Sequence, residues 1–202
     1  MTTPHDALAA VRNRNFRRFL SYRFLFTFAV QMEATVVAWI IYQLTGDPLS
    51  LGLIGLAEAV PYLCTSLIGG YAADRIERKK IALAATSMFT MGSVLFYAAA
   101  LFPEALPATR PWCYYTIIFT TGIARGFLAP SVTAMFAQVL PRELYANGAA
   151  WNTNTWQTAA VAGPAAGGLM LGWFSNTTAF GIVLGFSVAS LIVLSLLPRY
   201  TL

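Results

Sequence analysis

Residues 61–80 read PYLCTSLIGGYAADRIERKK, and an apolar run at 81–101 follows directly. Every residue at 74–80 except Ile76 is charged, and an apolar segment of hydrocarbon length lies on each side. So short a turn between two such segments indicates a tight hairpin held at a membrane surface. Its positive charges place it on the cytoplasmic side, because short cytoplasmic loops are enriched in Lys and Arg.

Composition supports a membrane protein that crosses the bilayer several times. Of 202 residues, 57% are hydrophobic and 10% are charged, whereas a soluble domain carries roughly 25% charged residues. The net charge of +5 therefore does not indicate a nucleic-acid partner. Cys64 and Cys113 lie in or beside apolar runs, so we expect free thiols. His5 is the only histidine, and no metal-spaced cluster or phosphate loop supports an enzyme, a metal site or a cofactor.

Apolar runs long enough to cross roughly 30 Å of hydrocarbon recur along the chain. They lie at about 19–44, 51–73, 81–101, 112–140, 147–174 and 178–197. We therefore predict an all-α membrane protein with six transmembrane helices. Its parts are a cytoplasmic tail at 1–18, a transmembrane domain at 19–197 and a cytoplasmic end at 198–202.

The distribution of basic residues tests this threading. The segments predicted to be cytoplasmic hold Arg12, Arg14, Arg17, Arg18, Arg75, Arg78, Lys79, Lys80, Arg142 and Arg199, and the outer loops hold Arg110. This bias predicts that both termini are cytoplasmic. For a bacterial protein, the membrane would be the inner membrane.

Two acidic residues lie within the predicted spans. Glu33 is near the middle of the first span, where a charge is costly unless it faces a cavity or is protonated. Glu58 lies one turn before Pro61 in the second span. It either faces a hydrated cavity or bonds backbone groups that Pro61 leaves unpaired.

Two arginines also lie within spans. Arg125 is at the centre of the fourth span, and because arginine keeps its proton it needs an anion, carbonyl groups or water. A functional role is our interpretation, and a structural ion pair is the alternative. Arg23 is nearer the cytoplasmic end of the first span, so we interpret it as reaching the interface.

The fifth span begins with a polar face. Asn147, Trp151, Asn154 and Thr158 share one side of a helix at steps of four, three and four residues. This face either lines an aqueous cavity or forms hydrogen bonds between helices.

The same span then becomes rich in small residues. Gly163 precedes Pro164, and Gly167 precedes Gly168. Gly163 and Gly167 are four residues apart, as are Gly168 and Gly172, and such spacing allows two helix backbones to approach closely. The second span carries a similar order, Pro61 before Gly69 and Gly70, which suggests two three-helix units of opposite orientation.

Three motifs carry a resemblance to a known family. The segment at 70–79, GYAADRIERK, resembles the loop 2–3 signature of the major facilitator superfamily, with Glu77 in place of the usual glycine. Arg125 with Gly126 resembles that family's mid-span arginine motif. The fifth-span glycines with Pro164 resemble its antiporter motif.

Further residues resemble the branch of this superfamily that contains the enterobactin exporter and macrolide efflux proteins. They include Gln31, Met32, Trp39, the segments at 42–46 and 51–56, Phe127 and Pro130. The resemblance implies half of a twelve-span fold, made of two three-helix repeats, in which two halves rock around a central substrate. We expect either a truncated or split chain that needs a C-terminal six-helix half, or two copies that pair.

The resemblance implies proton-coupled efflux of a small organic compound such as a siderophore or a drug. The proton-coupling candidates are Glu33 and Glu58, and the cavity candidates are Gln31, Arg125, Trp151, Asn154 and Thr158. The loop with Gly70, Asp74, Arg75, Arg78 and Lys79 would act as a conformational latch. The alternative, a membrane assembly module that transports nothing, predicts tight helix contacts without a hydrated face.

Overall fold

The computed structural model describes residues 7–103 and 110–198, without the side chains of Ala73 and Asp74. The described residues form long helices joined by short turns, and the 3-10 turn η1 (Arg142–Leu144) precedes the fifth of them. The long helices are α1 (Arg14–Thr45), α2 (Pro48–Arg75), α3 (Arg78–Leu101), α4 (Pro111–Val139), α5 (Tyr145–Trp173) and α6 (Asn176–Ser195). The predicted all-α fold is confirmed.

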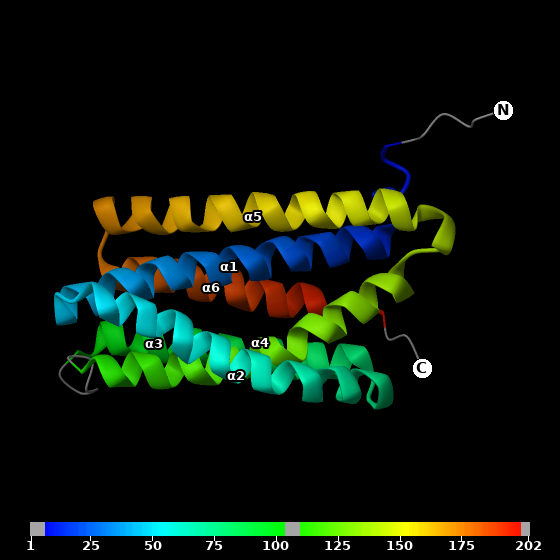
Figure 1. Ribbon diagram of the computed structural model, residues 1–202. Helices are drawn as coiled ribbons and strands as arrows, with labels where there is room; N and C mark the ends of the chain where they lie inside the picture. Colours follow the sequence, from blue (N-terminus) through cyan, green and yellow to red (C-terminus); the bar gives the residue numbers. More distant parts are fainter. Residues whose placement is uncertain (1–6, 104–109, 199–202) are drawn as a thin grey trace.

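Successive helices run in alternate directions along one bundle (Figure 1). The start of α1, the α2–α3 turn, the α4–α5 connection and the end of α6 lie at one end of the bundle. The α1–α2 and α5–α6 turns lie at the other end. The charged hairpin therefore shares an end with the basic residues at the start of α1.

Within the described residues, five helices are long and apolar enough to cross a membrane: α1, α2, α3, α4 and α6. The remaining long helix, α5, has 29 residues, which would span about 43 Å at 1.5 Å per residue. α5 is therefore long enough to cross a membrane. It differs from the other long helices in composition, because its first half, from Asn147 to Thr158, is polar.

The helix pairs repeat across the bundle. α1 packs against α5 and α6, and α4 packs in the corresponding way against α2 and α3. α3 and α6 pack against each other. If α1, α2 and α3 are exchanged for α4, α5 and α6 in that order, the pair α1–α5 becomes α4–α2 and the pair α1–α6 becomes α4–α3. The pair α3–α6 is unchanged by the exchange. Because α1 and α4 run in opposite directions (Figure 1), this pattern agrees with two three-helix units of opposite orientation.

Glycines allow close backbone contact in two of these helix pairs, α1–α5 and α2–α4. A Cβ added to Gly163 of α5 would lie 3.0 Å from the Phe28 carbonyl oxygen of α1. A Cβ added to Gly69 of α2 would lie 2.8 Å from the Gly126 carbonyl oxygen of α4. These glycines therefore let the backbones touch, as the spacing of Gly163 and Gly167 suggested.

Local signals account for the helix ends that orient α1 and α2. The Asn13 side chain accepts hydrogen bonds from the first turn of α1, which begins before the predicted span start at Phe19. Gly46 ends α1 with a φ of 64°, a left-handed conformation that favours glycine. Asp47 then caps α2 through the Leu49 amide at 3.0 Å, and Pro48 occupies the first turn.

Candidate functional site

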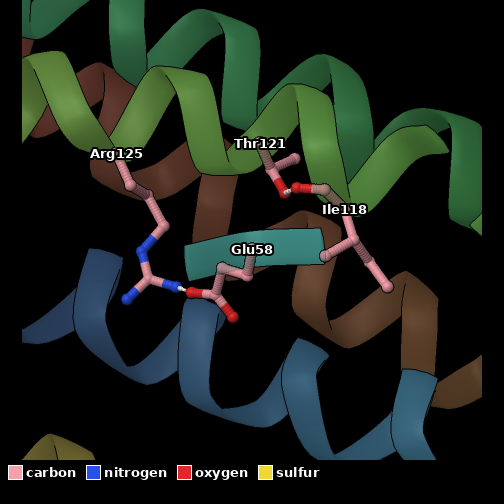
Figure 2. Close-up of polar contacts among 4 residues, drawn as sticks. All are labelled: Glu58, Ile118, Thr121 and Arg125. Carbon is pink, nitrogen blue, oxygen red and sulfur yellow. Dashed lines mark hydrogen bonds and ion pairs between the residues drawn. The ribbon is translucent and has the colours of Figure 1, made fainter. Parts of the chain in front are cut away.

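The predicted intramembrane arginine pairs with one of the two predicted acids. Arg125 Nη1 on α4 forms an ion pair with Glu58 Oε1 on α2 (Figure 2). Both side chains are about one-third exposed. The neighbouring Thr121 hydroxyl is directed to its own helix, where it donates to the Ile118 carbonyl at 2.9 Å (Figure 2). The charge of Arg125 is therefore balanced by Glu58.

Backbone contact between α2 and α4 brings this pair together. A Cβ added to Gly122 would lie 2.8 Å from the Glu58 carbonyl oxygen. One turn further along α4, Gly126 meets the Tyr62 carbonyl of α2 at the same distance. Thr65 Oγ1 donates to the Pro61 carbonyl at 2.7 Å. A side-chain hydroxyl of α2 thus bonds to the backbone at Pro61, and Glu58 is directed to Arg125.

The second predicted acid is buried beside this pair. Glu33 is 5% exposed, and its carboxylate accepts a hydrogen bond of 2.5 Å from Ser93 Oγ on α3. Glu33, Glu58 and Arg125 all line one small cavity of about 30 Å³. Since a cavity of roughly 10–15 Å³ of this kind can hold one water, water can bridge the three groups. We call Glu33, Glu58 and Arg125 the charged group.

An open pocket of about 320 Å³ adjoins the charged group, and Arg125 lines both spaces. Helices α1, α2, α4 and α5 form its walls. Its lining residues are Arg23, Phe26, Thr27, Val30, Gln31, Tyr62, Arg125, Leu128, Ala129, Thr133 and Trp156. Of the predicted cavity candidates, Gln31 and Arg125 line this pocket.

The polar face of α5 lies elsewhere. The Trp151 indole and the Asn147 amide both donate to the Ala7 carbonyl, at 2.8 and 3.0 Å. This part of the face holds the segment that precedes α1. Asn154 and Thr158 are exposed on α5 outside the pocket lining, and Trp156 is the α5 residue that lines the pocket.

Sequence reasoning missed several pocket residues. Arg23 was interpreted as an interfacial residue, yet it lines the pocket together with Thr27 and Gln31. These three residues follow one another at four-residue steps, which places them on one face of α1. This polar stripe is the sequence pattern that indicates a pocket-facing side of α1. Trp156 carried no such signal, since it lies about 200° around α5 from Asn154.

The fifth-span glycines divide into two groups. Gly163 and Gly167 contact α1, with an added Cβ on Gly167 3.2 Å from the Met32 carbonyl oxygen. Gly168 and Gly172 face open space within the described residues. Of the two predicted close pairs, the structure forms the first, while Gly168 and Gly172 line an apolar groove beside Trp39.

The predicted latch loop contacts two neighbouring helices. Arg78 Nη1 donates to the Ala134 carbonyl of α4 at 3.5 Å. Lys79 Nζ donates to the Ser195 carbonyl at 2.8 Å and to the Leu197 carbonyl, at the end of α6. Arg75 lies over the Tyr71 ring, 4.6 Å from its centroid.

Two other members of the loop are placed differently. A Cβ on Gly70 would meet nothing within 4 Å among the described residues, and the Asp74 side chain lies outside the described part. Glu77, which replaces the family's glycine, has a φ of −52°. This turn therefore needs no left-handed residue.

Within the residues described, no group of three His, Cys, Asp or Glu side chains is placed to hold a metal ion. The two cysteines, Cys64 and Cys113, are free thiols, as expected.

Comparison with known proteins gives a family from the sequence and a matching fold from a solved structure. The family model described as "Major Facilitator Superfamily" matches residues 19–201. "Multidrug resistance protein 2" of Bacillus subtilis is 27% identical over 154 residues, which cover 76% of this chain and 34% of that protein. "Macrolide efflux protein A" of Streptococcus pyogenes is 25% identical over 150 residues, which cover 74% of this chain and 36% of that protein.

The fold comparison agrees. The crystal structure of the POT family transporter PepTSo superimposes with a TM-score of 0.75 at 16% identity, over 94% of this chain and 40% of that one. The chain thus spans about a third of the length of the curated relatives that it matches.

Proposed function

Since the chain belongs to the Major Facilitator Superfamily, a family of membrane transporters and not of enzymes, we propose that it supplies one six-helix half of an exporter of small organic compounds. Relatives whose names refer to multidrug resistance and macrolide efflux support the direction of transport. The observation that carries the proposal is the charged group beside the open pocket. Ionisable side chains placed inward in a membrane protein mark substrate or ion pathways.

The charged group offers a route to proton coupling. Glu58 holds either a proton or the guanidinium of Arg125, because a protonated carboxyl group lacks the charge that the ion pair needs. Proton binding would thus free Arg125 toward the pocket, which it already lines. Glu33, held by Ser93 beside the same cavity, is the second candidate acid. We propose antiport of substrate against protons.

The α2–α3 loop is the proposed conformational latch. Arg78 reaches α4 and Lys79 reaches the end of α6, so the loop ties cytoplasmic helix ends together in this conformation. Asp74 and Arg75 would complete the latch toward the second half of the transporter. Breaking these contacts would accompany rocking of the two halves.

A single six-helix half encloses no pathway, so the proposal includes a partner. That partner is a C-terminal six-helix half, or a second copy of this chain. An even number of spans places both termini on one side, which allows parallel pairing. We propose the inner membrane, a cytoplasmic tail at 1–18, the transmembrane domain at 19–197 and a cytoplasmic end at 198–202.

Proton flux tests the proposal. Everted vesicles are prepared from cells that express the chain alone and from cells that express it together with a C-terminal six-helix half. At least one preparation should release protons from its acidified lumen when a macrolide or a siderophore is added. A variant with both Glu33→Gln and Glu58→Gln should lose this response, while either single variant identifies the titrating acid. Flux that persists in the double variant would remove the coupling mechanism. The absence of any response to either compound class in both wild-type preparations would favour the membrane assembly module.

A further inference from the structure

Arg23 is a charged pocket residue that the proposed mechanism does not use. It lies on α1 and lines the open pocket, and its Nε atom is buried. No hydrogen bond or ion pair links its guanidinium to another described residue. Arg125, the other arginine of the pocket, is already paired with Glu58.

The pocket therefore carries an unbalanced positive charge. Its lining contains these two arginines and neither aspartate nor glutamate. Arg23 is half-buried and its Nε atom is buried without a hydrogen-bond partner. Partial removal of a charge from water without a partner is costly, and arginine cannot relieve this cost by losing its proton. A bound anion would supply the missing partner, and the planar guanidinium matches a carboxylate through two parallel hydrogen bonds.

The rest of the lining indicates what the anion is attached to. Phe26, Tyr62 and Trp156 contribute aromatic surface, and the Trp156 side chain is 46% exposed. Thr27 and Gln31 continue from Arg23 along α1, so the polar stripe extends about 12 Å at 1.5 Å per residue. A volume of about 320 Å³ falls within the range of small-molecule sites, roughly 300–1,000 Å³.

We propose that this pocket binds an amphiphilic organic anion, with its carboxylate on Arg23 and its ring system against the aromatic side chains. The inference rests on the proposed function and names the substrate class for that site. Arg23 is then the residue that selects anions over neutral or cationic compounds of the same shape. Glu58 remains free to bind and release a proton, while Arg125 keeps its charge.

Three naphthalene probes of one shape and different charge test this proposal. They are 2-naphthoate, 2-naphthamide and 2-naphthylmethylammonium, and binding is measured by equilibrium dialysis on the whole chain in nanodiscs of neutral phosphatidylcholine. We expect naphthoate to bind about tenfold tighter than naphthamide, since a hydrogen-bonded charge pair is worth about one decade in affinity or more. Arg23→Gln should remove this difference, because it should weaken naphthoate binding far more than naphthamide binding.

Arg17→Gln is the matched control, because Arg17 is an exposed arginine of the same helix outside the pocket. It should bind naphthoate like the wild type. Arg23→Lys should keep part of the preference for naphthoate over naphthamide, since lysine keeps the positive charge but cannot form two parallel hydrogen bonds to a carboxylate. If Arg23→Gln does not fold, the proposal is tested by the order of the three probe affinities in the wild type and by the affinities of the Arg23→Lys variant.

The outcomes separate the inference from the proposed function. Equal affinity for naphthoate and naphthamide, or a preference that survives Arg23→Gln, overturns the anion site and leaves an exporter of other compounds standing. Failure of all three probes to bind also overturns the anion site. That failure, combined with a proton flux response to a macrolide, still supports transport.

Discussion

The guanidinium of Arg125 on α4 forms an ion pair with the carboxylate of Glu58 on α2, beside the contact at which the two helix backbones touch. Gly122 permits that contact, because any larger residue would meet the Glu58 carbonyl. The position of a charged pair inside the bundle is thus set by a residue without a side chain. Charge pairing and helix packing are linked at this point.

Removal of both members of the pair should destabilise the protein by less than the sum of the two single removals. Arg125→Gln leaves the Glu58 carboxylate without its cation, and Glu58→Gln leaves the guanidinium without its anion. We expect each single variant to lose about 1–2 kcal/mol of stability, reduced by the partial exposure of the pair. The double variant should lose less than the sum, with a coupling of about 1 kcal/mol. Thermal unfolding in detergent measures this cycle, and additive losses would contradict a paired arrangement.

Substitution in the α1–α5 seam should depend on which glycine is changed. Gly163→Leu would force a side chain against the Phe28 carbonyl and Gln31 of α1, and overpacking costs about 1–3 kcal/mol. Gly168→Leu, with nothing within 4 Å among the described residues, is the matched control. A lower melting temperature is expected for the first variant alone. Equal effects would show that α5 does not pack as described.

Lys79 should matter more than its neighbour Lys80. Lys79 is buried and donates to carbonyl groups at the end of α6, so Lys79→Met leaves them unsatisfied at a cost of about 1–3 kcal/mol. Lys80 is exposed and pairs with Glu77 at 3.2 Å, and an exposed pair is worth about 0–1 kcal/mol. Hydrogen exchange at 190–197 should accelerate in Lys79→Met and stay unchanged in Lys80→Met. Similar exchange in both variants would contradict the anchoring role.

The threading predicts opposite sides for the two ends of α2. In a background with Cys64→Ser and Cys113→Ser, a cysteine at Lys80 should react with an impermeant thiol reagent from the cytoplasmic side. A cysteine at Asp47 should react from the outside, since α2 separates these positions by one crossing. Labelling of both from the same side of intact cells would contradict the six-span topology.

Sequence patterns were sufficient for the parts of the site that carry a strong energetic signal. Glu33, Glu58 and Arg125 stand out because a charge within an apolar span needs a partner or water. The structure places all three around one small cavity. The helices themselves follow from length, capping residues and turn glycines such as Gly46.

The weaker signals were not sufficient, because they depend on neighbours that are distant in sequence. The polar face of α5 indicated either an aqueous cavity or hydrogen bonds between helices, and the Trp151 indole donates to the Ala7 carbonyl of the segment before α1. Trp156 enters the pocket because α5 turns that side toward α1 and α4, and no periodicity predicts this. The two glycine pairs of α5 have the same spacing, and only packing shows that Gly163 contacts α1 while Gly168 does not.

We expect that water enters the membrane through the open pocket and reaches the charged group. In the cysteine-free background, Gln31→Cys and Thr133→Cys place thiols at the pocket, and Ile192→Cys places one on an exposed apolar surface of α6. Membrane fragments, whose two faces are both accessible, are treated with a water-soluble thiol reagent that does not cross the bilayer. The reaction rate of each thiol measures how far water reaches that position. The account predicts that the two pocket thiols react quickly and the α6 thiol slowly. Pocket thiols that react no faster than the α6 thiol would contradict it.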